Sequence, residues 1–164
     1  MQTYKPLVAL LLLSGCALFK PKPPPVTLRI HEEANESLPE KLVRIVQLPV
    51  TDQRVVVDPY PQLTERDLLD ARSVSTPGGL AVKLQFDLHG AHTFDEMTTR
   101  MRGRYIVVFV DDKPVAAVLV EKRVTNGEFL LETGMTEAET QALVVKLRQI
   151  TGKKRDFGDT PLAP

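Results

Sequence analysis

Two apolar runs separated by four residues restrict the fold of this chain more than any other feature. Tyr105 to Val110 (YIVVFV) and Val115 to Val120 (VAAVLV) carry no charge, and Asp111-Asp112-Lys113-Pro114 between them is short enough for an antiparallel hairpin. Strands of this composition occur where both faces of a sheet are covered. We therefore expect a central hairpin in which Asp111 and Asp112 are turn residues. They are not expected to form a catalytic carboxylate pair, because neighbouring side chains at a strand end point in opposite directions.

Periodicity and capping patterns predict the elements around this hairpin. Alternation of apolar and polar residues, or a β-branched run, indicates strands over 26–30, 42–48, 54–58, 80–86 and 128–132. Thr64 with Asp67, and Thr136 with Glu139, have the spacing of a capping box. Helices are therefore predicted over 65–72, over 90–102, and from the second capping box to Gly152. This order indicates an α+β fold, with a mainly antiparallel sheet and two or three helices on one face.

The first sixteen residues have the pattern of an export signal. Lys5 precedes Leu7–Leu13, an apolar run too short to span a bilayer, which takes about 20 residues. Leu13-Ser14-Gly15-Cys16 resembles the bacterial lipobox, in which the cysteine receives a diacylglyceryl group and becomes the first residue after cleavage. Cys16 is the only cysteine, so it has no disulfide partner within the chain. We expect cleavage after residue 15 and a lipid on Cys16.

The lipid interpretation divides the rest of the chain. Residues 16–25 hold Cys16 and a proline-rich segment, which favours an extended spacer of about 3.1 Å per residue. Residues 26–152 suit a single domain, and 153–164 are expected to form a flexible tail. Ala17 follows the cysteine in place of the aspartate that retains enteric lipoproteins in the inner membrane. The expected location is therefore the periplasmic side of the cell envelope, with the outer membrane favoured.

The second half of the chain resembles the periplasmic P1 head of SecD, a protein-export subunit. The resemblance lies in Leu63–Leu68 with Ala71, Val82–Phe86 with Asp87 and Gly90, Phe94–Gly103, Tyr105–Val120, and Thr133-Gly134 before Thr136–Glu139. It covers roughly residues 60–148. This sequence departs from the family at Asp112, which replaces the usual turn glycine, and in a slightly shorter segment before the last helix.

The resemblance implies a P1-head-like fold and contact with emerging polypeptides. SecD also has several membrane-spanning helices that couple export to proton movement, whereas the only apolar segment of that kind here is the cleavable signal. We therefore expect a head-type module mounted on a lipid, without that coupling. A shared fold is not by itself evidence of a shared function.

Little in the composition points to catalysis, cofactors or nucleic acid. The 21 basic and 21 acidic residues balance, and no basic stripe is interleaved with aromatic residues. His89 and His92 lie three apart at the start of a predicted helix, but zinc sites normally take three or four protein ligands, and a third is not evident. No nucleophile elbow or phosphate-binding loop is present. We expect neither catalytic nor cofactor nor metal residues, and no small-molecule substrate.

A non-catalytic binding module is therefore the leading hypothesis. Recognition through an exposed sheet edge or an apolar groove would suit an export or folding accessory, with exported polypeptides or envelope proteins as partners. Val26–Ile30 and Glu128–Glu132 are the candidate edge strands. The alternative is a structural envelope lipoprotein that has one fixed protein partner.

Overall fold

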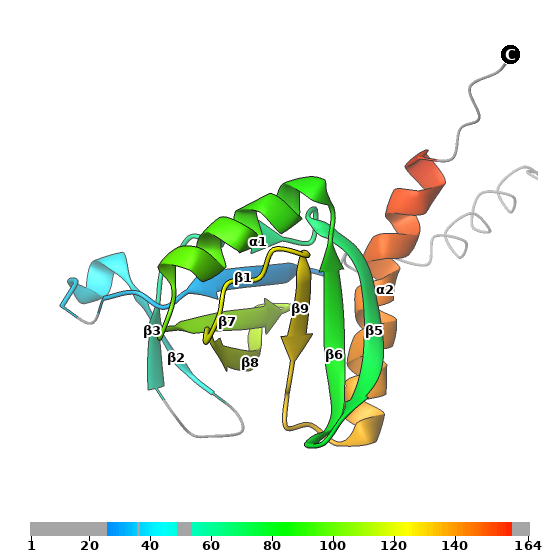
Figure 1. The fold of residues 1–164 in the computed structure, drawn as a ribbon. Coiled ribbons are helices and arrows are strands. Elements are labelled where there is room, and N and C mark those ends of the chain that lie inside the picture. Colours follow the sequence, from blue (N-terminus) through cyan, green and yellow to red (C-terminus); the bar gives the residue numbers. More distant parts are fainter. Residues whose placement is uncertain (1–25, 36, 49–53, 159–164) are drawn as a thin grey trace, which may run out of the picture.

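The computed structural model describes residues 26–35, 37–48 and 54–158. The predicted signal segment, Cys16 with its spacer, and the last six residues lie outside this range. The strands in it are β1 (Leu28–Glu32), β2 (Arg44–Gln47), β3 (Arg54–Val57), β4 (Leu63–Thr64), β5 (Leu68–Thr76), β6 (Gly79–Phe86), β7 (Tyr105–Val110), β8 (Lys113–Leu119) and β9 (Glu128–Leu131) (Figure 1). The helices are the short 3₁₀ turn η1 (Glu40–Leu42), α1 (Leu88–Arg100) and α2 (Glu137–Gly158). No helix in the described part is both long and apolar enough to cross a membrane.

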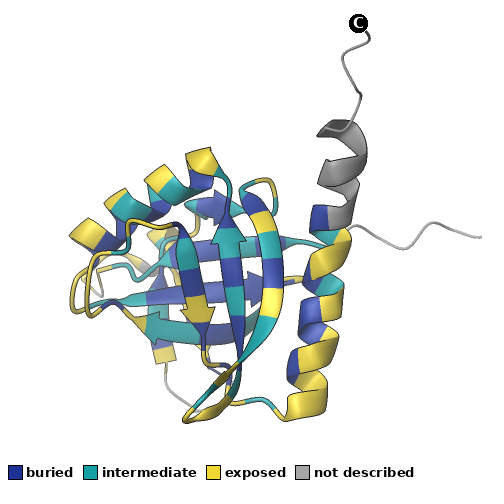
Figure 2. Cartoon of the chain, turned by 45° about the vertical axis from the view of Figure 1, so that its right-hand side comes forward, coloured by how far each residue is buried: buried dark blue, intermediate teal, exposed yellow. Residues whose placement is uncertain are grey.

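The strands form three antiparallel sheets. Their orders are β4-β1-β7-β8, β2-β3 and β5-β6-β9, and every pairing is antiparallel. The expected α+β class and antiparallel strand arrangement are confirmed, although the strands divide among three sheets and do not form one. Figure 1 shows α1 crossing over the body and α2 lying alongside β5. The outward faces of both helices are largely exposed (Figure 2).

Two clusters of buried side chains lie on opposite faces of β7. Ile106, Val108 and Val110 face the main core, which is closed by the β5-β6-β9 sheet and both helices. Val107 and Phe109 face a smaller cluster under the β2–β3 hairpin. Of the two strands predicted to be central and covered on both faces, β7 is so covered, because alternate side chains of one strand point into different layers. The prediction is wrong for β8, which is an edge strand with several partly exposed residues.

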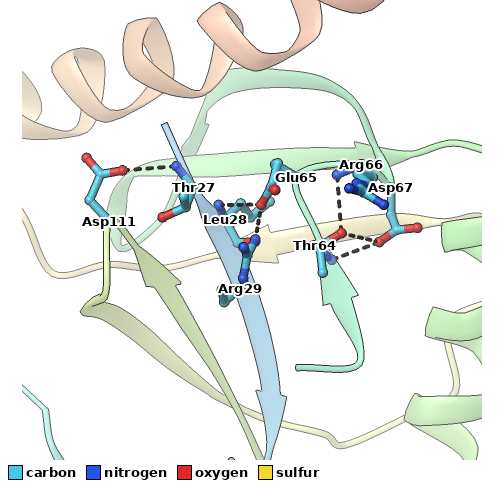
Figure 3. Close-up of polar contacts among 8 residues, drawn as sticks. All are labelled: Thr27, Leu28, Arg29, Thr64, Glu65, Arg66, Asp67 and Asp111. Carbon is cyan, nitrogen blue, oxygen red and sulfur yellow. Dashed lines mark hydrogen bonds and ion pairs between the residues drawn. The ribbon is translucent and has the colours of Figure 1, made fainter. Parts of the chain in front are cut away.

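The predicted helix over residues 65–72 is wrong. Figure 3 shows that Thr64 and Asp67 close a tight turn: the Asp67 carboxylate accepts from the Thr64 N–H at 2.8 Å, and the Thr64 hydroxyl accepts from the Arg66 N–H at 3.3 Å. The chain then pairs with β6 from Leu68 to Thr76. The capping residues are used, but strand pairing with the following strand β6 replaces the helix that they would otherwise begin.

The final helix matches the prediction at its start and differs at its end. The Thr136 N–H donates to Glu139 Oε2 at 2.9 Å and the Thr136 hydroxyl accepts from the Glu139 N–H, which is a reciprocal capping box. Hydrogen bonds from Thr136 lower the pKa of Glu139. The predicted end at Gly152 is wrong, because α2 continues to Gly158.

The β7–β8 turn confirms Asp111 and Asp112 as turn residues. Both have positive φ, 49° and 61°, which aspartate tolerates better than most residues. Asp111 also accepts from the Thr27 N–H at 3.0 Å and pairs with Lys146 of α2 at 2.5 Å. The hydrogen bond from Lys146 is the main cause of a lowered pKa at Asp111. The turn thus joins the start of β1 to α2.

Candidate functional site: the groove between β8 and β9

Strand edges are the first place to look for a binding surface, since an unpaired edge can add another strand. The β4 edge is only two residues long. The β5 edge is covered by α2, and Arg148 Nε donates to the outward carbonyl oxygen of Ala71 at 2.8 Å. The remaining edges of the two larger sheets are β8 and β9. Of the two predicted candidates, Glu128–Glu132 is therefore on an edge, whereas Val26–Ile30 is not, because β1 lies between β4 and β7.

A groove of about 950 Å³ lies between these two edges. Side chains from α1, β7 and β9 supply an apolar floor that includes Phe94, Ile106 and Phe129. The walls comprise residues 117–126 from the end of β8 and the following loop, with Lys83, Glu128, Leu130 and Glu132 on the opposite side. The groove therefore combines an apolar interior with two strands whose outer edges face it.

The ladder pattern shows which backbone groups of β9 face the groove. The Phe86 N–H donates to the Gly127 carbonyl at 3.0 Å, so alternate pairs in this register, including Leu84–Phe129, exchange hydrogen bonds. The intervening residue Leu130 therefore turns its N–H and C=O away from β6 and toward the groove. Its side chain is 42% exposed.

The same argument applies to β8. The Glu33 N–H donates to the Tyr105 carbonyl at 2.9 Å, which places the hydrogen bonds of Tyr105 and Val107 on the β1 side of β7. Ile106 and Val108 consequently bond to β8, where their partners are Val118 and Ala116. Ala117 and Leu119 are therefore the β8 residues whose backbone groups point outward. Two strand edges thus present donors and acceptors to one space.

The loop between β8 and β9, which forms part of the groove wall, is held in place by specific contacts. The Thr98 hydroxyl of α1 accepts from the Val124 N–H at 3.0 Å. Gln85 Nε2 donates to the carbonyl of Asn126 at 3.3 Å, so the loop is also tied to β6. Asn126-Gly127, a dipeptide typical of tight hairpin turns, leads into β9, and Gly127 has φ +65°. It does not close a hairpin here, because β8 and β9 lie in different sheets. These contacts fix the position of the loop that links the two edges by tying it to α1 and to β6.

Charges at the rim are balanced. Three basic and three acidic side chains line the groove: Lys83, Lys122, Arg123, Glu121, Glu128 and Glu132. Lys83 pairs with Glu128 at 2.5 Å, and Arg123 makes two contacts with Asp95 at 2.5 and 2.7 Å. The hydrogen bond from Arg123 lowers the pKa of Asp95. A rim with both signs of charge selects neither an anionic nor a cationic ligand.

The histidines weighed as metal ligands lie outside this groove. His89 Nδ1 is 3.2 Å from an Asp67 carboxylate oxygen, and His92 Nδ1 is 3.6 Å from a Glu96 oxygen. Both imidazoles are largely exposed, and each faces a different carboxylate. Across the described ranges, no group of three or more His, Cys, Asp or Glu side chains could hold a metal ion.

Comparison with known proteins identifies relatives of the domain. Residues 41–150 match the family model described as SecDF, P1 head subdomain. The chain is 33% identical over 87 residues to protein translocase subunit SecD of Acidaminococcus fermentans, which covers 52% of the chain and 21% of that protein. It is also 33% identical over 89 residues to protein translocase subunit SecDF of Thermus thermophilus, which covers 52% of the chain and 12% of that protein. The chain thus spans only a small part of these curated relatives.

Solved structures agree with this assignment at the level of fold. One, titled as the structure and function of a membrane component SecDF that enhances protein export, superimposes with a TM-score of 0.58 at 22% identity, covering 75% of this chain and 62% of that chain. A second, SecDF in a super-membrane-facing form, gives a TM-score of 0.56 at 24% identity, covering 75% and 18%. The predicted resemblance to a P1 head is therefore confirmed.

Proposed function

This chain belongs to the SecDF P1 head subdomain family, and we propose that it is a non-catalytic module that binds polypeptides in the β8–β9 groove. The observation that carries the proposal is the meeting of two free strand edges over an apolar floor. The relatives named as protein translocase subunits support a role in protein export. A binding role also agrees with the balanced rim, since exported polypeptides differ widely in charge.

The proposed mechanism is strand addition. An extended segment lying along β9 would exchange hydrogen bonds with the N–H and C=O of Leu130. Because β8 runs across β9 (Figure 1), Ala117 and Leu119 would offer further donors and acceptors to only one end of that segment. Apolar side chains of the segment would then contact the exposed apolar side chains that line the groove, such as Leu119 and Leu130, which are 43% and 42% exposed. Main-chain pairing does not depend on sequence, whereas the floor favours apolar side chains. A short edge gives weak binding, which suits a client that must be released.

Replacing Leu130 with proline is expected to weaken peptide binding about tenfold, because the lost N–H donor points at the groove and not at β6. The probe is a short synthetic peptide in which Val and Thr alternate, with affinity measured by fluorescence anisotropy. Leu130→Ala is the matched control, since it keeps the N–H and removes only apolar contact. We expect a loss of about threefold or less for the alanine variant. Circular dichroism on all three proteins checks that the sheet is retained.

N-methylated versions of the peptide test the mechanism without changing the protein. Two versions of the peptide carry methyl groups on alternate sets of amides. Binding should weaken about tenfold for the version whose methylated amides are the ones that would pair with β9. Equal binding of all versions would contradict strand addition and leave only an apolar groove. If no version binds the wild-type protein, the polypeptide-binding function itself is wrong.

We also propose that Cys16 anchors this module to the envelope membrane. The support is the Leu13-Ser14-Gly15-Cys16 lipobox after a short apolar run, followed by the proline-rich segment to residue 25. Cys16→Ala should abolish incorporation of a clickable palmitate analogue and move the protein from the membrane to the soluble fraction. Labelling that persists in the alanine variant would contradict the anchor. Separation of inner and outer membranes in the same cells tests the outer-membrane preference that Ala17 suggests.

Crosslinking in the native cells separates the proposed function from the alternative. Many exported polypeptides or translocon subunits captured by the wild-type protein would support an export or folding accessory. One dominant envelope protein would instead favour a structural lipoprotein with a fixed partner. Leu130→Pro should reduce the first pattern and leave the second unchanged.

A further inference from the structure

His31 is a buried titratable side chain that the groove does not use. It lies on β1 with only 3% of its surface exposed, on the face of the four-stranded sheet that the β2–β3 hairpin covers. Its Nδ1 is 2.7 Å from the carbonyl oxygen of Asp58, just after β3. Because a carbonyl oxygen only accepts, Nδ1 carries the proton and Nε2 carries the lone pair. A further proton would therefore have to enter at Nε2.

The surroundings of His31 disfavour a positive charge. Its ring lies 5.0 Å from the ring of Phe109 at an interplanar angle of 68°, and the Arg44 guanidinium lies 4.7 Å above that same ring. Arg29 on β1 adds a second cation, which is paired with Glu65 (Figure 3). The carboxylate of Asp58 opposes them and also holds the Tyr60 N–H at 2.8 Å. Burial is the main reason that the pKa of His31 is lowered from its ordinary value of 6.5.

The hairpin covering His31 depends on this interface. It packs through a small apolar cluster, which comprises Val46, Leu48, Val55 and Val57 on one side and Val107 and Phe109 on the other. Two backbone hydrogen bonds hold its base: Ala34 N–H to Val56 C=O at 2.8 Å and Asp58 N–H to Glu32 C=O at 2.9 Å. A two-stranded ribbon is at best marginally stable alone. A change at its base therefore affects the whole hairpin.

We propose that His31 makes docking of the β2–β3 hairpin onto β7 sensitive to pH, so that mild acidification raises the fraction of molecules in which the hairpin is released and Val107 and Phe109 are exposed. This proposal does not depend on the polypeptide-binding function. In the released state His31 meets water and regains its ordinary pKa, so that state binds more protons. Docking is therefore fully stable above about pH 7 and weakens as the pH falls through 6.5 toward the lowered pKa of the docked form.

The test uses the fact that His31, His89 and His92 are the only three histidines in the chain. A His89→Gln/His92→Gln protein leaves His31 as the sole titrating imidazole. Amide hydrogen exchange measured by NMR at about pH 7.5 and about pH 5.5, corrected for intrinsic rates, should show protection at Val46 and Val55 falling, by up to about tenfold. Tenfold is the largest change in the opening equilibrium that one histidine can cause between these two pH values, if its pKa is 6.5 in the released state and it stays neutral in the docked state. Protection at Leu84 and Phe129, in the other large sheet, should not change.

His31→Asn in the same background is the matched control. Its side-chain amide keeps a donor for the Asp58 carbonyl and cannot titrate, so hairpin protection should become independent of pH. An unchanged pH dependence in the asparagine variant would overturn the proposal. So would a parallel loss of protection at Leu84 and Phe129, which would indicate global destabilisation. If the asparagine variant does not fold, the His89→Gln/His92→Gln protein alone tests the proposal. Its hairpin amides should lose protection at low pH while those of Leu84 and Phe129 do not, and NMR titration of the His31 ring protons should give a pKa below 6.5.

Discussion

Replacing Phe94 with alanine is expected to lower the free energy of unfolding by about 3–5 kcal/mol, the usual range for removing a buried aromatic ring. Phe94 is 1% exposed, and its ring centroid lies 5.2 Å from that of Phe86 and 4.8 Å from that of Phe129. The ring therefore joins α1 to both β6 and β9. Urea denaturation followed by far-ultraviolet circular dichroism measures the loss.

Phe94→Leu is the matched control for this prediction. Leucine keeps most of the apolar contact and leaves a smaller cavity, so we expect a loss of about 1–2 kcal/mol. Equal losses for the two variants would contradict the argument, because the ring contacts with Phe86 and Phe129 would then contribute nothing beyond a side chain of intermediate size. A loss below about 1 kcal/mol for the alanine variant would show that α1 does not depend on this ring.

Features set by local sequence were predictable from the sequence alone. Tyr105–Val110 is buried on both faces because it is apolar at every position, and the short polar link after it leaves little choice but a hairpin. The Thr136–Glu139 capping box likewise acts where it stands, since its geometry involves only neighbouring residues. These signals require no knowledge of what lies far along the chain.

The two capping-box patterns show where local signals stop being sufficient. Thr136 with Glu139 begins a helix, whereas Thr64 with Asp67 closes a turn into β5. The hydrogen-bonding chemistry is alike in both places. The difference is that β5 finds a long antiparallel partner in β6 directly after the Thr76–Gly79 turn, and the ladder outweighs a weak helical preference.

Strand order explains why the candidate site was only half predicted. Alternation of apolar and polar residues identifies a strand but not the strands beside it. The sequence therefore cannot distinguish Val26–Ile30 from Glu128–Glu132 as the edge strand. In the fold, β4 pairs on one side of β1 and β7 on the other. The groove arises because β8 and β9, the uncovered edges of two different sheets, both line one space. None of those relations is local, and the aromatic floor has no sequence signal that separates it from ordinary core.

The glycine of the Asn126-Gly127 turn is the second position at which a small change should have a large effect. Gly127→Ala is expected to lower the free energy of unfolding by about 2–4 kcal/mol. Gly127 has φ +65°, and a Cβ there would lie 2.6 Å from the Ala91 Cβ and 3.3 Å from the Ala91 Cα. Both backbone strain and a clash with α1 contribute, and thermal and urea unfolding measure their sum.

Gly103→Ala separates these two contributions. Gly103 also has positive φ, +76°, but nothing lies within 4 Å of its Cβ position, so only backbone strain of about 1–2 kcal/mol is expected. Combining Gly127→Ala with Ala91→Gly removes the clashing methyl group and should recover part of the loss, beyond the cost of Ala91→Gly measured alone. Equal losses at the two glycines, or no recovery in the double variant, would show that the loop before β9 is not packed against α1. The position of the loop that links the two groove edges depends on that packing.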